Sequence, residues 1–267
     1  MVSKLRSFAL FCLPLLLACL IFPGNVYAAK KPKALIFDQP GRMEVAVVYE
    51  TAFATQKGTV KALKLVSKSM KKAMGFQGSA TLKSQDGKQV IVLSQWQDAA
   101  SYQTYATTAA TTASKTSIPS ETTPGMTTPP VPARTLVLQL EKAQPSIAGT
   151  IPALRGKEAV VHLSRWTAKS PEFQPEVLAQ VEAMIPSLLA TQPVPQSVLL
   201  LKAIETGEVA LWRNWNCSAL FEDVGVPTAL IPDKALAALA DSEQLLYDVV
   251  NLIPVEEKKV KADEEKA

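Results

Sequence analysis

The side chain in this chain best suited to proton transfer is that of His162, the only histidine among 267 residues. An imidazole has an ordinary pKa near neutral pH, so it can accept and return a proton under physiological conditions. His162 lies between Val161 and Leu163 in a segment with the pattern of a strand. Two interpretations are open: a general base or donor that faces a ligand, or a histidine that serves only the strand.

Two tryptophans end two similar segments of the chain. Residues 90–96 read VIVLSQW and residues 209–215 read VALWRNW, so Trp96 and Trp215 occupy the same place. A tryptophan at a strand end can wall a pocket for a flat aromatic or polyene ligand. It can equally be a packing plug between a sheet and the helix that follows. We expect Trp96 and Trp215 to take one of these two roles.

The second of these segments sets an extra tryptophan beside two asparagines. Trp212, Asn214 and Asn216 alternate along it and therefore point to one face of the predicted strand. Asn214 could hydrogen-bond a substrate oxygen or an oxyanion, or it could serve a turn or a backbone group. If one copy keeps a site, we expect His162 and Asn214 in the catalytic role, with the tryptophans and Asn216 binding the ligand.

Several kinds of site are excluded by counting residues. One histidine and three cysteines cannot form a His- or Cys-rich metal site, and no EF-hand loop is present. No Gly-rich phosphate loop, dinucleotide fingerprint or nucleophile elbow occurs, and 11 glycines leave little material for one. Metal binding through carboxylates alone stays open but has no loop signature, and we expect no metal and no cofactor.

The elements that would position these residues occur twice. Residues 44–51 and 158–166 alternate like strands, and each is followed by a segment with apolar residues every three or four positions, typical of a helix with one buried face. Asp86-Gly87 and Thr206-Gly207 then predict two hairpins. Each copy ends in a closing strand, residues 134–140 and 244–253. One such layer cannot bury both faces of its sheet, so the second copy supplies the cover.

The predicted order is strand, helix, strand, strand, helix, strand, which is a ferredoxin-like order. We expect an α+β fold with repeats at residues 41–142 and 156–253. Residues 107–133 are rich in Thr, Ala, Ser and Pro and are predicted to be a mobile insertion. Residues 254–267 are predicted to be a charged, disordered tail.

The two strand-to-helix junctions, LSQWQD at residues 93–98 and WRNWNCS at residues 212–218, resemble the S/N-x-W junction of antibiotic biosynthesis monooxygenase-like domains. In the second copy Asn214 stands directly before the tryptophan rather than two residues before it. These domains belong to the dimeric α/β-barrel superfamily. The resemblance covers both repeats and implies that they pack as an internal pseudo-dimer within one monomeric chain.

The family includes cofactor-free monooxygenases that act on polyketide quinols, haem-degrading enzymes and members without an assigned reaction. The resemblance therefore implies either oxidation of a small aromatic or polyketide-like molecule, or non-catalytic binding of a ligand or partner. In the oxidative case His162 or Asn214 would assist proton transfer to or from the ligand inside a small apolar pocket. The haem-degrading branch ligates iron through a histidine on a helix, and His162 is predicted on a strand, which argues against haem.

The N-terminus has the pattern of an export signal. Lys4 and Arg6 precede an apolar run of about 15 residues, short of the roughly 20 needed to span a bilayer. We expect cleavage after Ala28, which gives a periplasmic or secreted protein with residues 1–28 removed. Two alternatives are an uncleaved anchor and a lipoprotein-type cleavage before Cys19. Only Cys217 remains after cleavage at Ala28, so no intramolecular disulfide is expected.

Charge limits the partners of the exported chain. Removal of residues 1–28 takes away two basic residues and no acidic one, so the formal net charge falls from +4 to +2. That charge does not favour nucleic acid, and no aromatic interleaving supports it. A lysine stripe runs from Lys57 to Lys71 along the first predicted helix at intervals of three and four. We interpret it either as a solvated helix face or as a patch for a membrane surface or an acidic partner.

Overall fold

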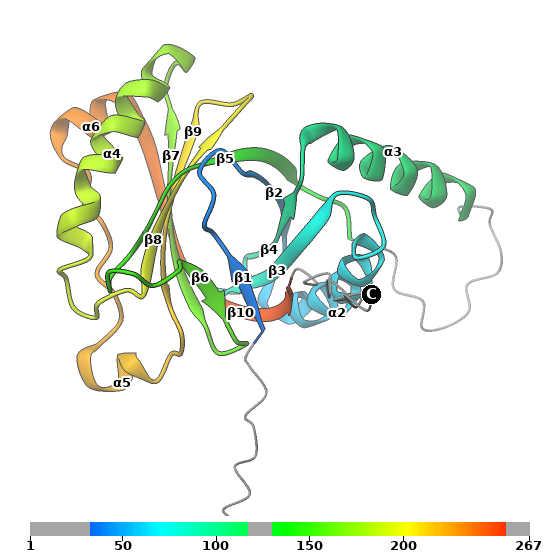
Figure 1. Cartoon of the computed structure of the whole chain (residues 1–267), viewed down its shortest axis with the longest axis horizontal. Helices are drawn as coiled ribbons and strands as arrows, with labels where there is room; N and C mark the ends of the chain where they lie inside the picture. Colours follow the sequence, from blue (N-terminus) through cyan, green and yellow to red (C-terminus); the bar gives the residue numbers. More distant parts are fainter. Residues whose placement is uncertain (1–32, 117–129, 255–267) are drawn as a thin grey trace, which may run out of the picture. The chain divides into compact units, whose positions relative to one another are not determined.

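The structure, a computed structural model, describes residues 33–116 and 130–254, and a closed barrel of eight strands forms its centre (Figure 1). Neighbouring strands are antiparallel, in the order β10-β3-β4-β2-β5-β8-β9-β7, and β7 pairs with β10 to close the barrel. The strands are β2 (Met43–Glu50), β3 (Phe76–Ser84), β4 (Gln89–Trp96), β5 (Arg134–Pro145), β7 (Val160–Ala168), β8 (Ser197–Ala203), β9 (Glu208–Trp215) and β10 (Ala240–Ile253). The predicted α+β fold is confirmed.

Helices cover the outside of the barrel on two sides (Figure 1). The first half of the chain contributes α2 (Phe53–Met70) and α3 (Ala99–Thr116). The second half contributes η1 (Pro171–Phe173), α4 (Gln174–Leu188), α5 (Leu220–Val224) and α6 (Lys234–Leu239). Each half therefore follows the ferredoxin-like order that the sequence predicts.

Two long strands join the halves into one barrel. β5 pairs with β2 of its own half up to Gln139 and with β8 of the other half from Leu138 onward. β10 in turn pairs with β7 of its own half up to Asp248 and with β3 of the first half from Tyr247 onward. This exchange of closing strands makes the two ferredoxin-like halves a single-chain dimeric α/β-barrel.

Alternation along the strands separates an inner core from two outer cores. The inward-facing residues of the eight strands form one apolar cluster inside the barrel. Outward residues of the first half pack under α2 and α3, and those of the second half pack under α4 and α6. Each sheet is thus buried on both faces, which is why a single half could not be stable alone.

A glutamine, buried in the first half and partly buried in the second, fastens the first helix of each half to the hairpin beside it. The Gln56 Nε2 donates to two hairpin carbonyls at 2.9 and 3.1 Å, and the Gln174 Nε2 donates to the two equivalent carbonyls at the same distances. The acceptors are Ser84, Gln89, Ala203 and Glu208. Satisfied buried amides fix geometry, so helix and hairpin are held in the same way in both halves.

The region expected to be an insertion is partly helical. α3 continues to Thr116, so residues 107–116 contradict the prediction of a mobile segment, and residues 117–129 lie outside the described residues. The Asp98 Oδ1 accepts from the Ser101 N–H at 2.7 Å and satisfies a donor at the start of this helix. Alanine favours helix strongly enough to continue it through the threonines.

The N-terminal lead-in also contains structure that the sequence did not predict. β1 (Ala34–Ile36) pairs with β6 (Ala153–Arg155) as a separate two-stranded ribbon. Strands of three residues are too short to show a periodic pattern, so both were missed. The predicted signal at residues 1–28 and the tail beyond residue 254 lie outside the described residues.

Candidate functional site

The β1–β6 ribbon closes one end of the barrel. Leu35, Phe37 and Leu154 are each 0% exposed and belong to the apolar cluster inside the barrel. The Phe37 N–H donates to the Pro152 carbonyl at 2.9 Å and extends the pairing of the ribbon. This end is therefore filled by the chain itself, and we call the ribbon the plug.

Two inward-facing amides hold the plug at equivalent places in the two halves. The Gln95 Nε2 donates to the Ile36 carbonyl at 2.8 Å, and the Asn214 Nδ2 donates to the Ala153 carbonyl at 2.9 Å. The Asn214 Oδ1 also accepts from the backbone N–H of Ser197 at 2.9 Å and from its hydroxyl at 2.8 Å. Asn214 is 1% exposed, so both ends of its amide are used structurally.

A carboxyl group is buried at the plug end of the barrel. Glu44 is 0% exposed, and its Oε1 accepts from the Gln95 Nε2 at 2.9 Å. Its Oε2 has no hydrogen-bond partner among the described residues. Burial raises the pKa of Glu44 well above its ordinary value, and the Gln95 hydrogen bond and the Arg42 charge oppose that shift only in part. The protonated form of Glu44 is therefore favoured.

The opposite end of the barrel contains a pocket. An apolar throat with a free volume of about 30 Å³, room for about two waters, lies inside the barrel. A polar vestibule of about 250 Å³ lies over it and shares part of its lining. The apolar side chains of the throat are those of Ala46, Val48, Ile91, Leu136, Leu138, Leu163, Ala210, Trp212, Leu245 and Tyr247.

The pocket lies on the pseudo-two-fold axis of the barrel. Met43 faces Trp96 in the first half as Val160 faces Trp215 in the second, so the strand registers match the halves residue by residue. By this match all lining residues except Trp212 form equivalent pairs: Ala46 with Leu163, Val48 with Arg165, Gln89 with Glu208, Ile91 with Ala210, Arg134 with Glu243, Leu136 with Leu245, and Leu138 with Tyr247.

Charged side chains form the rim between throat and vestibule. Arg134 pairs with Glu208 at 3.3 Å across the two halves, and Arg165 contacts Glu243 within the second half. The matched positions differ in chemistry, since the Arg134 guanidinium has the Glu243 carboxylate as its counterpart. The rim therefore offers a ligand two guanidinium and two carboxylate groups around an apolar opening.

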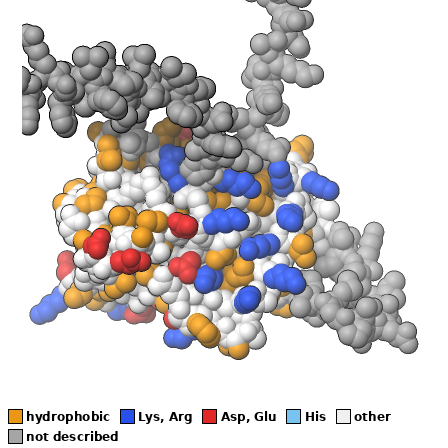
Figure 2. Space-filling view, turned by 90° about the horizontal axis from the view of Figure 1, so that it is seen from below, with side chains coloured by type: hydrophobic (Ala, Val, Ile, Leu, Met, Phe, Trp, Pro, Cys, Tyr) orange, Lys and Arg blue, Asp and Glu red, His pale blue; other side chains and the backbone are white. Residues whose placement is uncertain are grey.

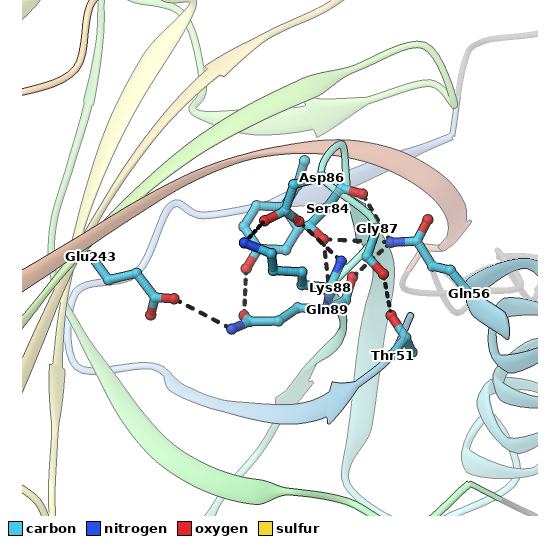
Figure 3. Close-up of polar contacts among 9 residues, drawn as sticks. Thr51, Gln56, Ser84, Asp86, Gly87, Lys88, Gln89 and Glu243 are labelled. Carbon is cyan, nitrogen blue, oxygen red and sulfur yellow. Dashed lines mark hydrogen bonds and ion pairs between the residues drawn. The ribbon is translucent and has the colours of Figure 1, made fainter. Parts of the chain in front are cut away.

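Gln89 connects the rim to the β3–β4 hairpin (Figure 3). Its Nε2 donates to the Glu243 Oε1 at 3.5 Å, and its Oε1 accepts from the Tyr247 hydroxyl at 2.8 Å. Its backbone N–H donates to the Ser84 hydroxyl at 2.8 Å, and its carbonyl is one acceptor of Gln56. The side of the rim that faces α2 is thus held by a continuous set of hydrogen bonds.

Two acids at the pocket have raised pKa values. Burial raises the pKa of Glu208, and the Glu243 charge adds to this while the Arg165 charge opposes it. The Glu208 Oε2 has no hydrogen-bond partner among the described residues. Burial, followed by the Glu243 charge, also raises the pKa of Tyr247, so its phenol stays protonated and donates. Glu208 is the carboxyl at this pocket best placed to exchange a proton.

Of the residues that the sequence singled out, Trp212 lines the pocket. It is 2% exposed and faces the barrel interior. Asn214 faces the same interior, at the plug end. Asn216 lies just after the last residue of β9 and is exposed. The structure therefore does not bring these three side chains together around one ligand.

Trp96 and Trp215 lie on the outer face of the barrel, in the packing role that the sequence left open. Trp96 is 0% exposed and contacts Tyr102 and Tyr105 of α3 with ring centroids 5.5 and 5.3 Å apart. Trp215 is 1% exposed, and its Nε1 donates to the Pro193 carbonyl at 3.1 Å. Each directly follows an inward-facing residue, so strand alternation turns it outward.

His162 also faces outward, away from the pocket. Its Nδ1 contacts the Arg213 guanidinium, which donates to the Thr228 carbonyl at 2.8 Å. Burial and then the Arg213 charge lower the pKa of His162 to about 4, and burial lowers that of Arg213 to about 10. A neutral imidazole accepts from Arg213 here and helps to fasten the segment after β9.

The rim residues were not predicted from the sequence. Their one signal is their parity along the strands. Glu208 and Ala210 share the parity of Trp212 on β9, and Arg165 shares the parity of Leu163 on β7. A charge at the end of an inward-facing apolar row marks the mouth of a barrel. Recognising it requires knowing which face points inward, and the sequence alone does not show that.

Comparison with known proteins supports the fold and does not extend to the chemistry. No protein-family model matches the chain, and no curated protein is similar to it in sequence. An anthrone oxidase-like protein superposes with a TM-score of 0.56 at 14% identity, covering 86% of this chain and 100% of that one. A proposed monooxygenase from Fusobacterium nucleatum superposes with a TM-score of 0.50 at 10% identity, covering 80% and 95%. The chain has the antibiotic biosynthesis monooxygenase-like fold.

Two further observations concern the described part of the chain only. Across residues 33–116 and 130–254, no helix is both long enough and apolar enough to cross a membrane. The same residues contain no group of three or more His, Cys, Asp or Glu side chains that could hold a metal ion.

Proposed function

We propose that this protein binds a small, largely apolar molecule with one polar end in the open end of its barrel. The observation that carries the proposal is an apolar throat that is blocked by the plug at one end and ringed by charges at the other. Binding sites for small molecules commonly combine an apolar lining with a few placed polar groups. The N-terminal signal pattern supports a periplasmic or secreted location for this binding.

The free volumes define how such a ligand would lie. Only a small apolar group fits the throat of about 30 Å³ beside Trp212, and the rest of the molecule occupies the vestibule of about 250 Å³. Arg134 and Arg165 are each held by a carboxylate, so they are preorganised donors for a carbonyl or phenol oxygen. A flat aromatic or polyketide-like molecule with an oxygen at one edge meets these requirements.

A second candidate function, cofactor-free oxidation, rests on Glu208. Its carboxylate would take the proton of a bound phenol or enol, and the resulting anion would react at carbon with O₂ to give a peroxide anion. This peroxide takes the proton back from Glu208 and becomes a hydroperoxide. Loss of water, with the hydrogen that remains on that carbon, then leaves a carbonyl, so one oxygen atom enters the product and the other leaves as water. His162 and Asn214 lie outside this pocket, which assigns the proton to Glu208 instead. Its raised pKa and its unpartnered Oε2 suit a general base.

Indole resonances provide the test of binding. 2-Naphthol, a two-ring phenol, is titrated into ¹⁵N-labelled protein, and we expect the Trp212 indole signal to shift and saturate. Trp96 and Trp215 lie on the outer face and serve as controls in the same spectrum. Ala210→Phe fills the throat and should abolish the shift. No shift at Trp212, or equal shifts at all indoles, would overturn the proposal.

Oxidation is tested separately with anthrone and O₂, with formation of anthraquinone as the readout. General-base catalysis contributes about 10²–10⁴-fold, so Glu208→Gln should lower the rate by at least about 10² while 2-naphthol still binds. A wild-type rate equal to that of buffer would dismiss oxidation of this substrate and leave the binding proposal intact.

A further inference from the structure

The chain segment that contains α2 is rich in positive charge. Residues 51–85 contain seven lysines and no acidic residue. The mature chain expected from the sequence has a formal net charge of only +2, so the rest of it is net negative. The six lysines on and just after α2 are all exposed; they are Lys57, Lys61, Lys64, Lys68, Lys71 and Lys72. Lys83 pairs with Asp248 and lies apart from them.

These six lysines lie on one flank of the helix. At 100° per residue they fall within about 100° of arc, away from the buried face. The buried face is formed by Gln56, Val60, Leu63, Ser67 and Met70. α2 is therefore fixed to the sheet along one side and presents a basic ridge of about 27 Å on another.

Apolar side chains accompany the ridge. Phe53 begins the helix and is 80% exposed, Leu65 lies at mid-length and is 65% exposed, and Met74 follows the helix and is 82% exposed. Figure 2 shows lysine and arginine side chains gathered on the half of the surface where α2 lies, with apolar side chains among them. We call these six lysines and three apolar residues the basic face.

The equivalent helix of the other half has the opposite charge. Glu172, Glu176 and Glu182 lie on or beside α4, and no lysine or arginine occurs between Lys169 and Lys202. The pseudo-symmetric barrel is therefore electrically polar, with a basic helix layer on one side and an acidic one on the other. Near a negatively charged surface, this distribution orients the molecule with α2 toward that surface.

We propose that the basic face docks the protein onto an anionic phospholipid bilayer. Lysines attract lipid phosphates as point charges without requiring a shaped site, and the three apolar side chains can enter the headgroup layer. The face is a ridge rather than a groove, which suits a flat surface better than a peptide or a helix. The proposal is independent of the barrel pocket, because none of its nine residues lines that pocket.

The physics of the docking differs from that of a free amphipathic helix. The apolar side of α2 is buried in the fold, so the helix cannot roll into the bilayer, and binding depends on charge with three small apolar contacts. Each lysine near an anionic surface strengthens partition by about fivefold, and salt screens this attraction. We therefore expect reversible binding that 0.5 M NaCl abolishes.

Vesicle sedimentation tests the proposal. Vesicles of phosphatidylcholine alone are compared with vesicles containing 30% phosphatidylglycerol, using both the full chain and a chain that starts at Ala29. The second chain prevents residues 1–28 from accounting for binding. The charge-reversed variant is Lys61→Glu, Lys64→Glu, Lys68→Glu. The matched control, Lys33→Glu, Lys157→Glu, Lys234→Glu, changes the net charge equally at exposed sites away from α2.

We expect phosphatidylglycerol-dependent partition that falls by at least about 100-fold in the charge-reversed variant and by much less in the control. Thermal unfolding should stay the same, because the three lysines are exposed. Leu65→Ser with Met74→Ser should weaken partition several-fold. Equal binding to both kinds of vesicle, or equal losses in both triple variants, would overturn the proposal. A third outcome would also overturn the proposal: the wild type binds no vesicles but binds an acidic protein, and the charge-reversed variant does not bind that protein. The basic face would then be a protein-binding surface.

Discussion

Replacement of Glu44 by glutamine tests whether the plug end of the barrel holds a neutral carboxyl. The folded state binds the Glu44 proton more tightly than the unfolded state does, because burial raises the pKa of the carboxyl. Above about pH 4.3, the unfolded chain therefore loses this proton first and is stabilised relative to the folded protein. The contribution of Glu44 to the free energy of unfolding should fall by about 1.4 kcal/mol per pH unit until the folded state also ionises.

Glutamine has the same shape as the protonated acid and can still accept from Gln95. Glu44→Gln should therefore match the wild type near pH 4 and become more stable than it as pH rises, until the folded wild type also ionises. Urea unfolding at half-unit intervals from pH 4 to 8.5 measures the difference, provided that unfolding is two-state. Glu176→Gln, on the exposed side of α4, is the control for loss of one surface carboxylate. Parallel pH profiles for the wild type and Glu44→Gln would show that Glu44 is ionised when folded and would refute this reasoning.

Three other exchanges test the described geometry. Trp212→Ala should lower the free energy of unfolding in urea by about 3 kcal/mol, the low end for such a change, because the ring already borders a cavity. Burial holds His162 neutral with a pKa of about 4, so the contribution of this residue to wild-type stability should fall by about 2–3 kcal/mol as pH drops from 6.5 to 4, opposite in sign to that of Glu44. His162→Gln should lack that loss in urea unfolding, and an unchanged loss would contradict a neutral His162. Gln95→Ala with Asn214→Ala leaves plug carbonyls unpaired, so hydrogen exchange at the Phe37 amide should accelerate, and unchanged protection would contradict their role.

The duplicated architecture could be predicted because its signals are local. Alternation marked β2 and β7, helical periodicity marked α2 and α4, and Gly87 marked a hairpin. The last of these has a clear physical basis, since Gly87 has a φ of +79° and a Cβ there would lie 2.8 Å from Phe53. Such signals depend only on neighbouring residues, so a single sequence carries them.

The pocket could not be predicted because it depends on register across the barrel. Its rim combines Arg134, Arg165, Glu208 and Glu243 from four strands and both halves, and no local pattern links them. The tryptophans drew attention by their chemistry, yet alternation decides their roles. Trp212 faces inward, whereas Trp215, three positions later, faces outward under the helices. To predict the site from the candidate residues, one must know which residues of each strand face the barrel interior.

The two halves share equivalent structural hydrogen bonds and differ in the charges on their surfaces. Gln56 and Gln174 clamp equivalent hairpins, and Gln95 and Asn214 hold the two sides of the plug. These interactions fix the first helix of each half and the plug to the barrel, so both halves depend on them. The surface positions carry no such constraint, which is why α2 can be basic while α4 is acidic.

This division explains how one fold accommodates the two proposed activities. A homodimer of identical halves would present the same helix face and the same rim residue twice. Fusion in one chain lets Gln89 pair with Tyr247 at the pocket while its counterpart Glu208 offers a carboxyl. Because Gln56 of α2 binds the carbonyl of Gln89, the basic face and the rim share one rigid connection. The proposed ligand site of mixed charge and the proposed one-sided docking face both require the asymmetry that a single chain permits.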